Sequence, residues 1–452
     1  MKLTNLLVST MIYTMMIGGA GCIGYSYYKN AHKDLQSAQL RTPAKGHRPA
    51  ALDMKLPFLS KSNSGEKTTM LLNDPDISKN WGLQVSDALK ARGITEGNRN
   101  IVVAVVDTGI DANHRDLKNN LWVNPGESGL DRLGQNKASN GIDDDQNGYK
   151  DDVHGWNFVN NSNRIDDNHG HGTHIAGIIG AEGGNGFGIT GIASKVSLMV
   201  LKYYDPKSPG NNLENTIKAF NYATQMRASI INYSGGGTDY SQKEYEAVRK
   251  ARSQGILFVA AAGNERSNSD QQKYYPANYD LDNIVSVTAI NPQLQVLSSS
   301  NYGVHSVHVA APGEEIYSTL PGNSFGTLTG TSQATAFATG LAVLIKANNP
   351  EFSYLAVKEH ILKTGDEYPW LRTKTGTSKK LNIYKALTTL DQGIGASGVL
   401  ASNSSGFRDG SFSSDPQSMQ NDPNMDPNTT RFVEFGKTLI KSMGVDRQIN
   451  NN

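Results

Sequence analysis

The feature that most constrains the fold of this chain is a series of short apolar runs that alternate with helical patterns between residues 74 and 390. Residues 101–106 contain only Ile, Val and Ala, as expected of a strand that is buried on both faces. The other apolar runs are 196–201, 230–233, 256–261, 284–288 and 307–310, and helical patterns cover 213–228 and 242–254. This alternation predicts an α/β fold, a three-layer sandwich with a mostly parallel sheet flanked by helices.

The composition excludes several classes of function. The chain has 43 Lys and Arg against 42 Asp and Glu, a net charge of +1, and no dense basic cluster, so we expect no nucleic-acid partner. A single cysteine among 452 residues excludes an intrachain disulfide and a cysteine-rich zinc site. Nucleotide binding is excluded because no glycine-rich phosphate-binding string opens a helix after the first strand.

Polar side chains follow several of the predicted strands. Asp107 follows the first strand, Ser234 follows 230–233, and Asn264 follows 256–261. Ligands of parallel sheets bind beyond the carboxyl ends of the strands, so these side chains are candidates for a site. Each of them alone could equally be a turn or capping residue.

Two predicted helix starts contain further candidate reactive or metal-binding residues. In the string HGHGTHIAG at 169–177, His171 and His174 could be metal ligands, but the glutamate of a zinc protease is absent between them. Ser332 lies at the start of a second apolar helix, where serine is most often a cap. There its hydroxyl is also near the positive end of a helix dipole, which favours developing negative charge.

An acid, a histidine, an amide and a serine together suit nucleophilic catalysis. A histidine can take the proton of a serine, and a buried carboxylate orients that histidine and stabilises its charged form. A side-chain amide can donate a hydrogen bond to the tetrahedral oxyanion.

Four strings carry this order of residues: VVDTG at 105–109, HGTH at 171–174, AAAGN at 260–264 and GTS at 330–332. Over about residues 74–390 the chain thereby resembles the subtilisin-like serine proteases, or subtilases (peptidase family S8). The resemblance implies that Asp107 orients, His171 is the general base and acid, and Ser332 is the nucleophile. It implies that Asn264 and the backbone N–H of Ser332 bind the oxyanion, and that His174 is structural.

The resemblance also implies a pocket for the residue before the cut bond. Its walls would be the backbone of Ser234, Gly235 and Gly236 on one side and of Ala261, Ala262 and Gly263 on the other. Because Gly237 extends the glycines to three, we expect an open or flexible pocket mouth and name no preferred residue. A further departure from the family is Gln333, which stands where methionine usually follows the nucleophile.

The string DDDQNGYKDD at 143–152 has the front half of a calcium-binding loop. Asp143, Asp145 and Asn147 occupy alternate positions and Gly148 follows, which lets several oxygens face one hard cation. His154 stands where such a loop has a bidentate glutamate, so Asp151 or Asp152 must substitute. Tyr149, which follows Gly148, is a further candidate ligand of this loop. The alternative is a solvated acidic loop. The family resemblance implies a second calcium site at Asp116 and the loop 185–189, including Asn185.

Both ends of the chain differ from this body. Within the first segment, 1–28, residues 3–28 form an uncharged run with Lys2 and Lys29 at its borders, and Cys22 follows several small residues. We expect a lipoprotein signal with Cys22 lipidated, the alternative being an uncleaved transmembrane helix. Residues 29–73 predict a basic tether, 391–430 a disordered linker, and 431–452 a short amphipathic helix and tail.

These observations predict a serine endopeptidase that forms an acyl-enzyme on protein or peptide substrates. We expect it to be exported, to be anchored in a bacterial cell envelope through its N-terminal lipid or helix, and to be monomeric. The alternative is a catalytically dead subtilase scaffold that acts as a calcium-stabilised surface binding protein. The complete set of Asp107, His171, Ser332 and Asn264 argues against that alternative.

Overall fold

The structure is a computed structural model that describes residues 73–208 and 210–389. The chain divides into two compact units, Met1–Asp391 and Gln392–Asn452, and every described residue belongs to the first. The predicted segment 1–28 with Cys22, the tether 29–73 except Asn73, the linker and the C-terminal helix lie outside the described residues.

A nine-stranded sheet forms the centre of the first unit. Its strand order is β10-β11-β7-β6-β5-β4-β1-β3-β2, and all neighbouring pairs are parallel except β10 and β11. The strands are β1 (Gly97–Asp107), β2 (Gly155–Asn157), β3 (Lys195–Lys202), β4 (Ile230–Tyr233), β5 (Leu257–Ala261), β6 (Ile284–Ile290), β7 (Val309–Pro312), β10 (Asp366–Glu367) and β11 (Lys379–Lys380). A separate antiparallel hairpin consists of β8 (Ile316–Leu320) and β9 (Ser324–Leu328).

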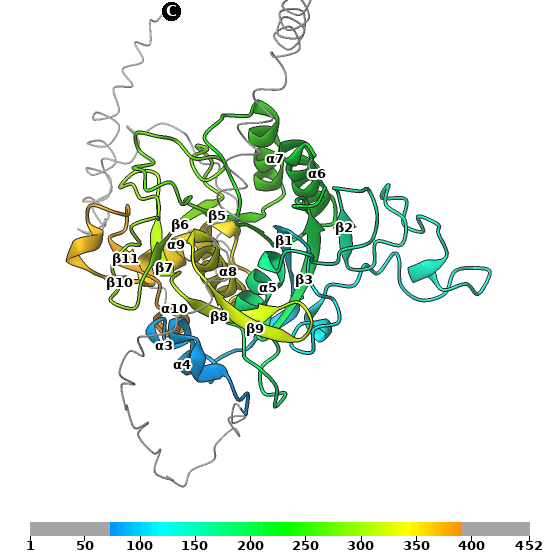
Figure 1. Cartoon of the computed structure of the whole chain (residues 1–452), viewed down its shortest axis with the longest axis horizontal. Coiled ribbons are helices and arrows are strands. Elements are labelled where there is room, and N and C mark those ends of the chain that lie inside the picture. Colours follow the sequence, from blue (N-terminus) through cyan, green and yellow to red (C-terminus); the bar gives the residue numbers. More distant parts are fainter. Residues whose placement is uncertain (1–72, 209, 390–452) are drawn as a thin grey trace, which may run out of the picture. The chain divides into compact units, whose positions relative to one another are not determined.

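Helices cover both faces of this sheet (Figure 1). They are α3 (Trp81–Val85), α4 (Ala88–Ala91), α5 (His171–Gly180), α6 (Asn212–Gln225), α7 (Gln242–Ser253), α8 (Thr331–Asn348), α9 (Tyr354–Thr364) and α10 (Ile383–Thr388). Helices α6 and α7 pack side by side on one face, and α5 and α8 pack on the other. None of the helices within 73–208 and 210–389 has the length and apolar character needed to cross a bilayer.

The apolar run of β1 is buried on both faces, as its composition predicts. Val103 and Val105 belong to the cluster that includes α5 and α8, whereas Ala104 and Val106 belong to the cluster that includes α6 and α7. Successive side chains of a strand point to opposite faces, so an unbroken apolar run lets β1 join both layers. The predicted three-layer α/β sandwich is therefore confirmed.

The sequence did not predict every strand. Each of the six apolar runs overlaps a strand. Strand β1 begins four residues before its run, and the apolar pattern does not include Gly97–Asn100 because they are polar and largely exposed. The short strands β2, β10 and β11 and the hairpin β8–β9 have no such run and are not predicted. The hairpin consists of Ile, Tyr, Ser, Thr, Leu, Phe and Gly, without a continuous apolar run, and it packs on α5 beside the site.

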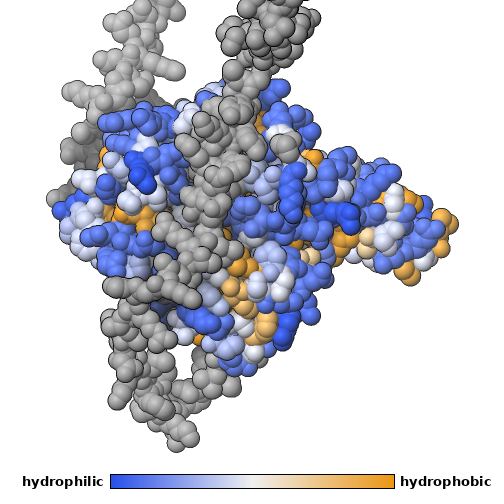
Figure 2. All heavy atoms as spheres, viewed as in Figure 1, coloured by the Kyte–Doolittle hydropathy of each residue, from blue (hydrophilic) through white to orange (hydrophobic). Residues whose placement is uncertain are grey.

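The connection between β1 and β2 carries the acidic string and projects from the body (Figure 1). Four large apolar side chains are exposed there: Val123, Leu130, Leu133 and Ile142, at 49%, 69%, 80% and 47%. In Figure 2 hydrophobic surface accordingly gathers over this projecting connection. The acidic string thus lies in a connection that is only partly covered by the rest of the chain.

Candidate active site

The first two candidate catalytic residues meet where β1 ends and α5 begins. Asp107 is the last residue of β1 and His171 the first residue of α5. Nδ1–H of His171 donates to Oδ1 of Asp107 at 2.7 Å. Gly172 permits this approach, because a Cβ there would lie 2.1 Å from the carbonyl oxygen of Gly109. The glycine of the HGTH string therefore allows the helix to begin against the strand end.

The surroundings of His171 favour its protonation. Burial opposes the charged ring, but the charge of Asp107 and its hydrogen bond outweigh burial and raise the pKa of His171, with Asp167 adding to the effect. Nε2 of His171 has no hydrogen-bond partner among the described residues. The histidine therefore has one nitrogen fixed by a carboxylate and the other available to a reacting group.

Asp167 organises the turn that leads into α5, and sequence reasoning missed it because its only signal is an acid near the histidines. Its Oδ1 accepts hydrogen bonds from Thr108 Oγ1 and from the backbone of His169 and Gly170, at 2.8 to 3.0 Å. Its Oδ2 accepts from the backbone and hydroxyl of Thr173 at 2.9 and 2.7 Å. A buried carboxylate with this many donors caps the helix start and holds the backbone on which His171 lies.

His174 is buried and contacts the backbone of the β8–β9 hairpin. Its Nε2 lies 2.9 Å from the carbonyl oxygen of Ile316 in β8 and 3.2 Å from that of Gly326 in β9. Burial, together with the charge of His171, lowers the pKa of His174 to about 3, so the ring is neutral. His174 therefore connects α5 to the hairpin.

Ser332 is the second residue of α8, and it is buried. Its hydroxyl donates to the carbonyl oxygen of Ser234 at 3.1 Å, and the hydroxyl of Ser234 donates to the carbonyl oxygen of Ser332 at 3.4 Å. The end of β4 and the start of α8 are therefore held together by reciprocal hydrogen bonds. As predicted, Ser332 lies at the amino end of a long helix, where the helix dipole is positive.

Asn264 is attached to the same helix start. Its Oδ1 accepts from the backbone N–H of Thr331 at 3.0 Å and from the hydroxyl of Thr331 at 3.2 Å. Its Nδ2 has no hydrogen-bond partner among the described residues. Because the oxygen of the amide is already bound, the amide has a fixed orientation and its N–H groups remain available beside Ser332.

The loop that carries Asn264 is held by Asn301, which sequence reasoning missed. Oδ1 of buried Asn301 accepts from the backbone of Glu265 and Ser267 at 3.0 and 2.9 Å. Its Nδ2 donates to the carbonyl oxygen of Ala262 at 2.9 Å. Asn301 thus binds backbone on both sides of Asn264, and no local sequence signal marks it.

The predicted open pocket mouth is not observed, because tyrosines fill the space that the glycines leave. The backbone of Gly237 pairs with that of Tyr275 through two hydrogen bonds, of 2.9 and 2.7 Å. A Cβ at Gly235 would lie 2.4 Å from the hydroxyl oxygen of Tyr203, and one at Gly236 would lie 2.4 Å from the ring of Tyr274. The glycines are therefore required by the neighbouring rings, and Gly237 is held in a regular pair.

The comparison with known families agrees with this geometry. The family model described as "Subtilase family" matches residues 98–395, which include Asp107, His171, Asn264 and Ser332. The chain belongs to the subtilase family.

Among curated subtilases, Subtilisin-like protease 1 of Plasmodium vivax is 33% identical over 348 residues, which are 72% of this chain and 53% of that protein. Its counterpart in Plasmodium falciparum (isolate 3D7) is 34% identical over 337 residues, 70% of this chain and 47% of that protein. This subtilase therefore spans about half the length of these relatives. The Major intracellular serine protease of Bacillus subtilis (strain 168) is 36% identical over 263 residues, 58% of this chain and 72% of that protein.

In the acidic string of this subtilase, a third carboxylate joins two of the predicted ligands. Carboxylate oxygens of Glu127, Asp143 and Asp145 all lie within 4.8 Å of one another. Glu127 is fully buried; its Oε1 accepts from the backbone of Asp144 at 2.7 Å, and its Oε2 has no partner among the described residues. A buried carboxylate oxygen without a partner next to two other carboxylates fits a cation site, and sequence reasoning missed Glu127 because it lies well before the string.

The remaining predicted ligands of the string have protein partners. Asp152 accepts from Asn124 and Asn147 at 2.8 and 2.9 Å and from the hydroxyl of Tyr222. Asp151 accepts from the backbone of Gly141 at 3.0 Å. The Tyr149 ring packs against aromatic residues of the core, and its backbone donates to Asn147.

The residues predicted for a second calcium site lie together, and protein donors already occupy both oxygens of Asp116. Asn185 Nδ2 donates to Oδ1 of Asp116 at 2.9 Å, and the backbone of Ile189 donates to Oδ2 at 3.0 Å. Burial raises the pKa of Asp116 to about 6, and the charges of Asp74 and Glu182 add to this increase. The hydrogen bonds from Asn185 and Ile189 lower the pKa but do not offset the effect of burial. The structure therefore brings Asp116 to the loop 185–189, as the resemblance implied.

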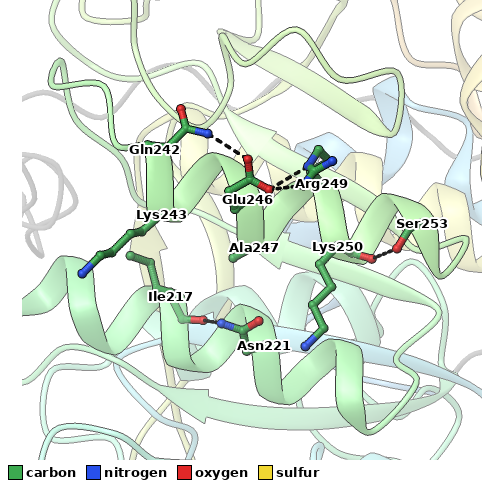
Figure 3. Close-up of a pocket in the computed structure, with 9 residues that line it drawn as sticks. All are labelled: Ile217, Asn221, Gln242, Lys243, Glu246, Ala247, Arg249, Lys250 and Ser253. Atoms are coloured by element: carbon green, nitrogen blue, oxygen red, sulfur yellow. Dashed lines mark hydrogen bonds and ion pairs between the residues drawn. The ribbon is translucent and has the colours of Figure 1, made fainter.

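A groove of about 600 Å³ lies between α6 and α7, away from these residues (Figure 3). In Figure 3, the carboxylate of Glu246 accepts hydrogen bonds from Gln242 and Arg249, while the side chains of Lys243 and Lys250 extend from α7. None of the candidate catalytic residues lines this groove, so its volume does not identify it as the active site.

Proposed function

We propose that this subtilase is a serine endopeptidase in which Asp107, His171 and Ser332 form the catalytic triad. The observation that carries the proposal is the buried hydrogen bond between Asp107 and His171, which leaves Nε2 of the histidine without a partner among the described residues. Strand β1, which ends at Asp107, pairs with β4, and Ser234 at the end of β4 holds the hydroxyl of Ser332. The substrates are peptide bonds of proteins or peptides, in keeping with the names of the relatives.

Acylation begins when Nε2 of His171 takes the hydroxyl proton of Ser332, and the serine oxygen bonds to the scissile carbonyl carbon. To reach Nε2, the Ser332 hydroxyl leaves its hydrogen bond with the carbonyl of Ser234. The proton on Nε2 then passes to the leaving nitrogen as the C–N bond breaks, which gives an acyl-enzyme. Water repeats these steps and releases the acid, and His171 and Ser332 return to their starting states.

The tetrahedral oxyanion is stabilised by Nδ2 of Asn264 and the backbone N–H of Ser332. Support comes from the fixed orientation of the Asn264 amide, whose oxygen is bound by Thr331. A preorganised donor of this kind typically contributes about 10²–10³ in kcat.

Labelling with a fluorophosphonate probe tests this proposal. The parent protein is expected to be labelled, and Ser332→Ala is expected to abolish labelling and to lower peptide hydrolysis by several orders of magnitude. Ser253→Ala, at the exposed end of α7, is the matched control and should label like the parent. A folded parent that is not labelled would instead support the dead scaffold with a binding role.

We also propose that the acidic string holds a structural calcium ion through Glu127, Asp143 and Asp145, with Asn147 beside them. The candidates Tyr149, Asp151 and Asp152 then support the loop or contribute further oxygens. Asp116 and Asn185 would hold a second ion. Calcium would supply positive charge that offsets the repulsion between carboxylates, and no catalytic step requires it.

From the sequence we also propose that the protease is exported and attached to the cell envelope through Cys22. Mass spectrometry of the mature N-terminus tests it, because a diacylglyceryl group on Cys22 is expected. An intact Met1 would instead favour a transmembrane anchor, and a free N-terminus beyond Cys22 would mean release. Cys22→Ser should leave the signal unprocessed if the lipoprotein hypothesis is correct.

A further inference from the structure

Tyr274 lies between the two stretches of backbone that form the walls of the proposed substrate pocket. A Cβ added to Gly236 would lie 2.4 Å from Cε1 of Tyr274, and one added to Gly263 would lie 2.9 Å from Cδ2. Cε1 and Cδ2 are diagonally opposite atoms of the ring. The ring of Tyr274 therefore extends from one wall to the other.

The position of this ring is fixed by its surroundings. Tyr274 is 1% exposed and belongs to the buried cluster that includes Tyr203 and Tyr233. Its backbone N–H donates to Oδ1 of Asn278 at 3.0 Å, and its carbonyl accepts from the backbone of Asn278 at 2.9 Å. Displacing the ring would open a cavity in a packed core and break this local turn, which makes rotation on substrate binding unfavourable.

Resting on the proposed function, we propose that Tyr274 shortens the pocket for the residue before the cut bond, so that this protease cleaves after Gly, Ala or Ser and disfavours Phe, Tyr and Leu. A large side chain between Gly236 and Gly263 would need the space that the Tyr274 ring occupies. A methyl or hydroxymethyl group needs only the mouth of the pocket. The selectivity is therefore steric, since a substrate side chain and the ring cannot occupy the same volume.

A series of peptide p-nitroanilides that differ only in this residue tests the proposal on the parent protein. Discrimination by pocket size reaches about 10–200-fold for each methylene, so kcat/KM for Ala is expected to exceed that for Phe by at least about 100-fold. Equal or better hydrolysis of the Phe substrate would overturn the proposal without any variant.

Variants at position 274 identify the ring as the cause. Tyr274→Gly should raise the ratio of kcat/KM for Phe over Ala by about 100-fold or more, whereas Tyr274→Phe keeps the ring and should keep the parent preference. Tyr240→Ala removes a tyrosine ring that is 54% exposed and is expected to leave the ratio unchanged. An unchanged ratio in folded Tyr274→Gly would contradict the proposal, and Tyr274→Leu provides a milder change if the glycine variant does not fold.

Failure of this inference can be distinguished from failure of the proposed function. A fluorophosphonate reacts at Ser332 without a side chain in the pocket, so labelling reports the nucleophile alone. A labelled parent that prefers Phe refutes the role of Tyr274 and leaves the protease intact, whereas an unlabelled parent refutes the protease.

Discussion

Nδ1 of His171 lies 2.7 Å from Oδ1 of Asp107, and the two side chains are only 1% and 3% exposed. Because the carboxylate oxygen accepts, Nδ1 carries the proton and the lone pair of neutral His171 is on Nε2. The same oxygen also accepts from the backbone of Thr108 at 2.8 Å, which fixes the carboxylate at the end of β1. One strand end and one helix start thereby determine both the tautomer and the orientation of the proposed base.

This pair predicts the pH dependence of hydrolysis. Burial opposes the charged ring, but Asp107 raises the pKa of His171, and the proposed base acts only when neutral. Activity should therefore be lost on acidification at a pH above the ordinary pKa of histidine. Asp107→Asn removes the charge, so the acid limb of the kcat/KM profile should move to lower pH, while kcat falls by about 10⁴ because an amide can hold the wrong tautomer.

The control for the pH profile is Asp282→Asn, which removes a carboxylate that pairs with Arg252 and Tyr354 instead. Its profile should match that of the parent. An acid limb that does not move in Asp107→Asn would exclude His171 as the titrating base.

The parts that the sequence predicted are those with local signals. Asp107 ends an apolar strand, and His171 and Ser332 lie at the starts of apolar helices, so strand and helix patterns place these three residues at element ends. Their roles follow from the resemblance of the strings that carry them. Tyr274, Glu127 and Asn301 have no such signal, because tertiary packing brings each to the site from a loop. The glycines at 235–237 predict open space, since a sequence does not indicate which rings fill the room beside a glycine.

Asn301 is expected to act on catalysis through Asn264. Asn301→Ala leaves the backbone N–H groups of Glu265 and Ser267 and the carbonyl of Ala262 without this partner, so the loop of Asn264 should move. We expect kcat to fall by about 10–100-fold with little change in KM, because the oxyanion forms after substrate binding.

A double-mutant cycle separates this positioning role from a general loss of stability. Asn264→Ala alone should lower kcat by about 10²–10³, and adding Asn301→Ala should then cost little more, since the donor that Asn301 positions is gone. Fully additive losses would mean that Asn301 acts independently of Asn264.

Glu127 is expected to control the response to calcium. A ligand that binds only the folded state stabilises it by RT ln(1 + [L]/Kd), about 2.7 kcal/mol at 100 times Kd, so chelation should lower the Tm of the parent. Glu127→Gln keeps an oxygen for the backbone of Asp144 but removes a ligand charge, and the calcium-dependent change in Tm should shrink. In chelator the variant should be at least as stable as the parent, because one of three adjacent carboxylates is neutral.

The control is Glu246→Gln on exposed α7, which should respond to calcium and chelator like the parent. A parent melting curve that chelator does not change would mean that the string is only acidic.

Gln333, the residue after the proposed nucleophile, is fully buried, and neither Oε1 nor Nε2 has a partner among the described residues. A buried polar group without a partner costs about 1–3 kcal/mol, and methionine has nearly the same volume without that cost. Gln333→Met should therefore raise the free energy of unfolding by about 1–3 kcal/mol, measured by denaturant titration, with fluorophosphonate labelling retained.

The substitution also changes the sensitivity of the protein to oxidation, because a thioether beside Ser332 can be oxidised to a polar sulfoxide. Peroxide should then inactivate Gln333→Met and leave the parent active, and methionine sulfoxide reductase should restore the variant. A loss of stability in Gln333→Met would mean that the glutamine amide is hydrogen-bonded in solution, for instance to a buried water, and that this amide contributes to the packing at the start of α8.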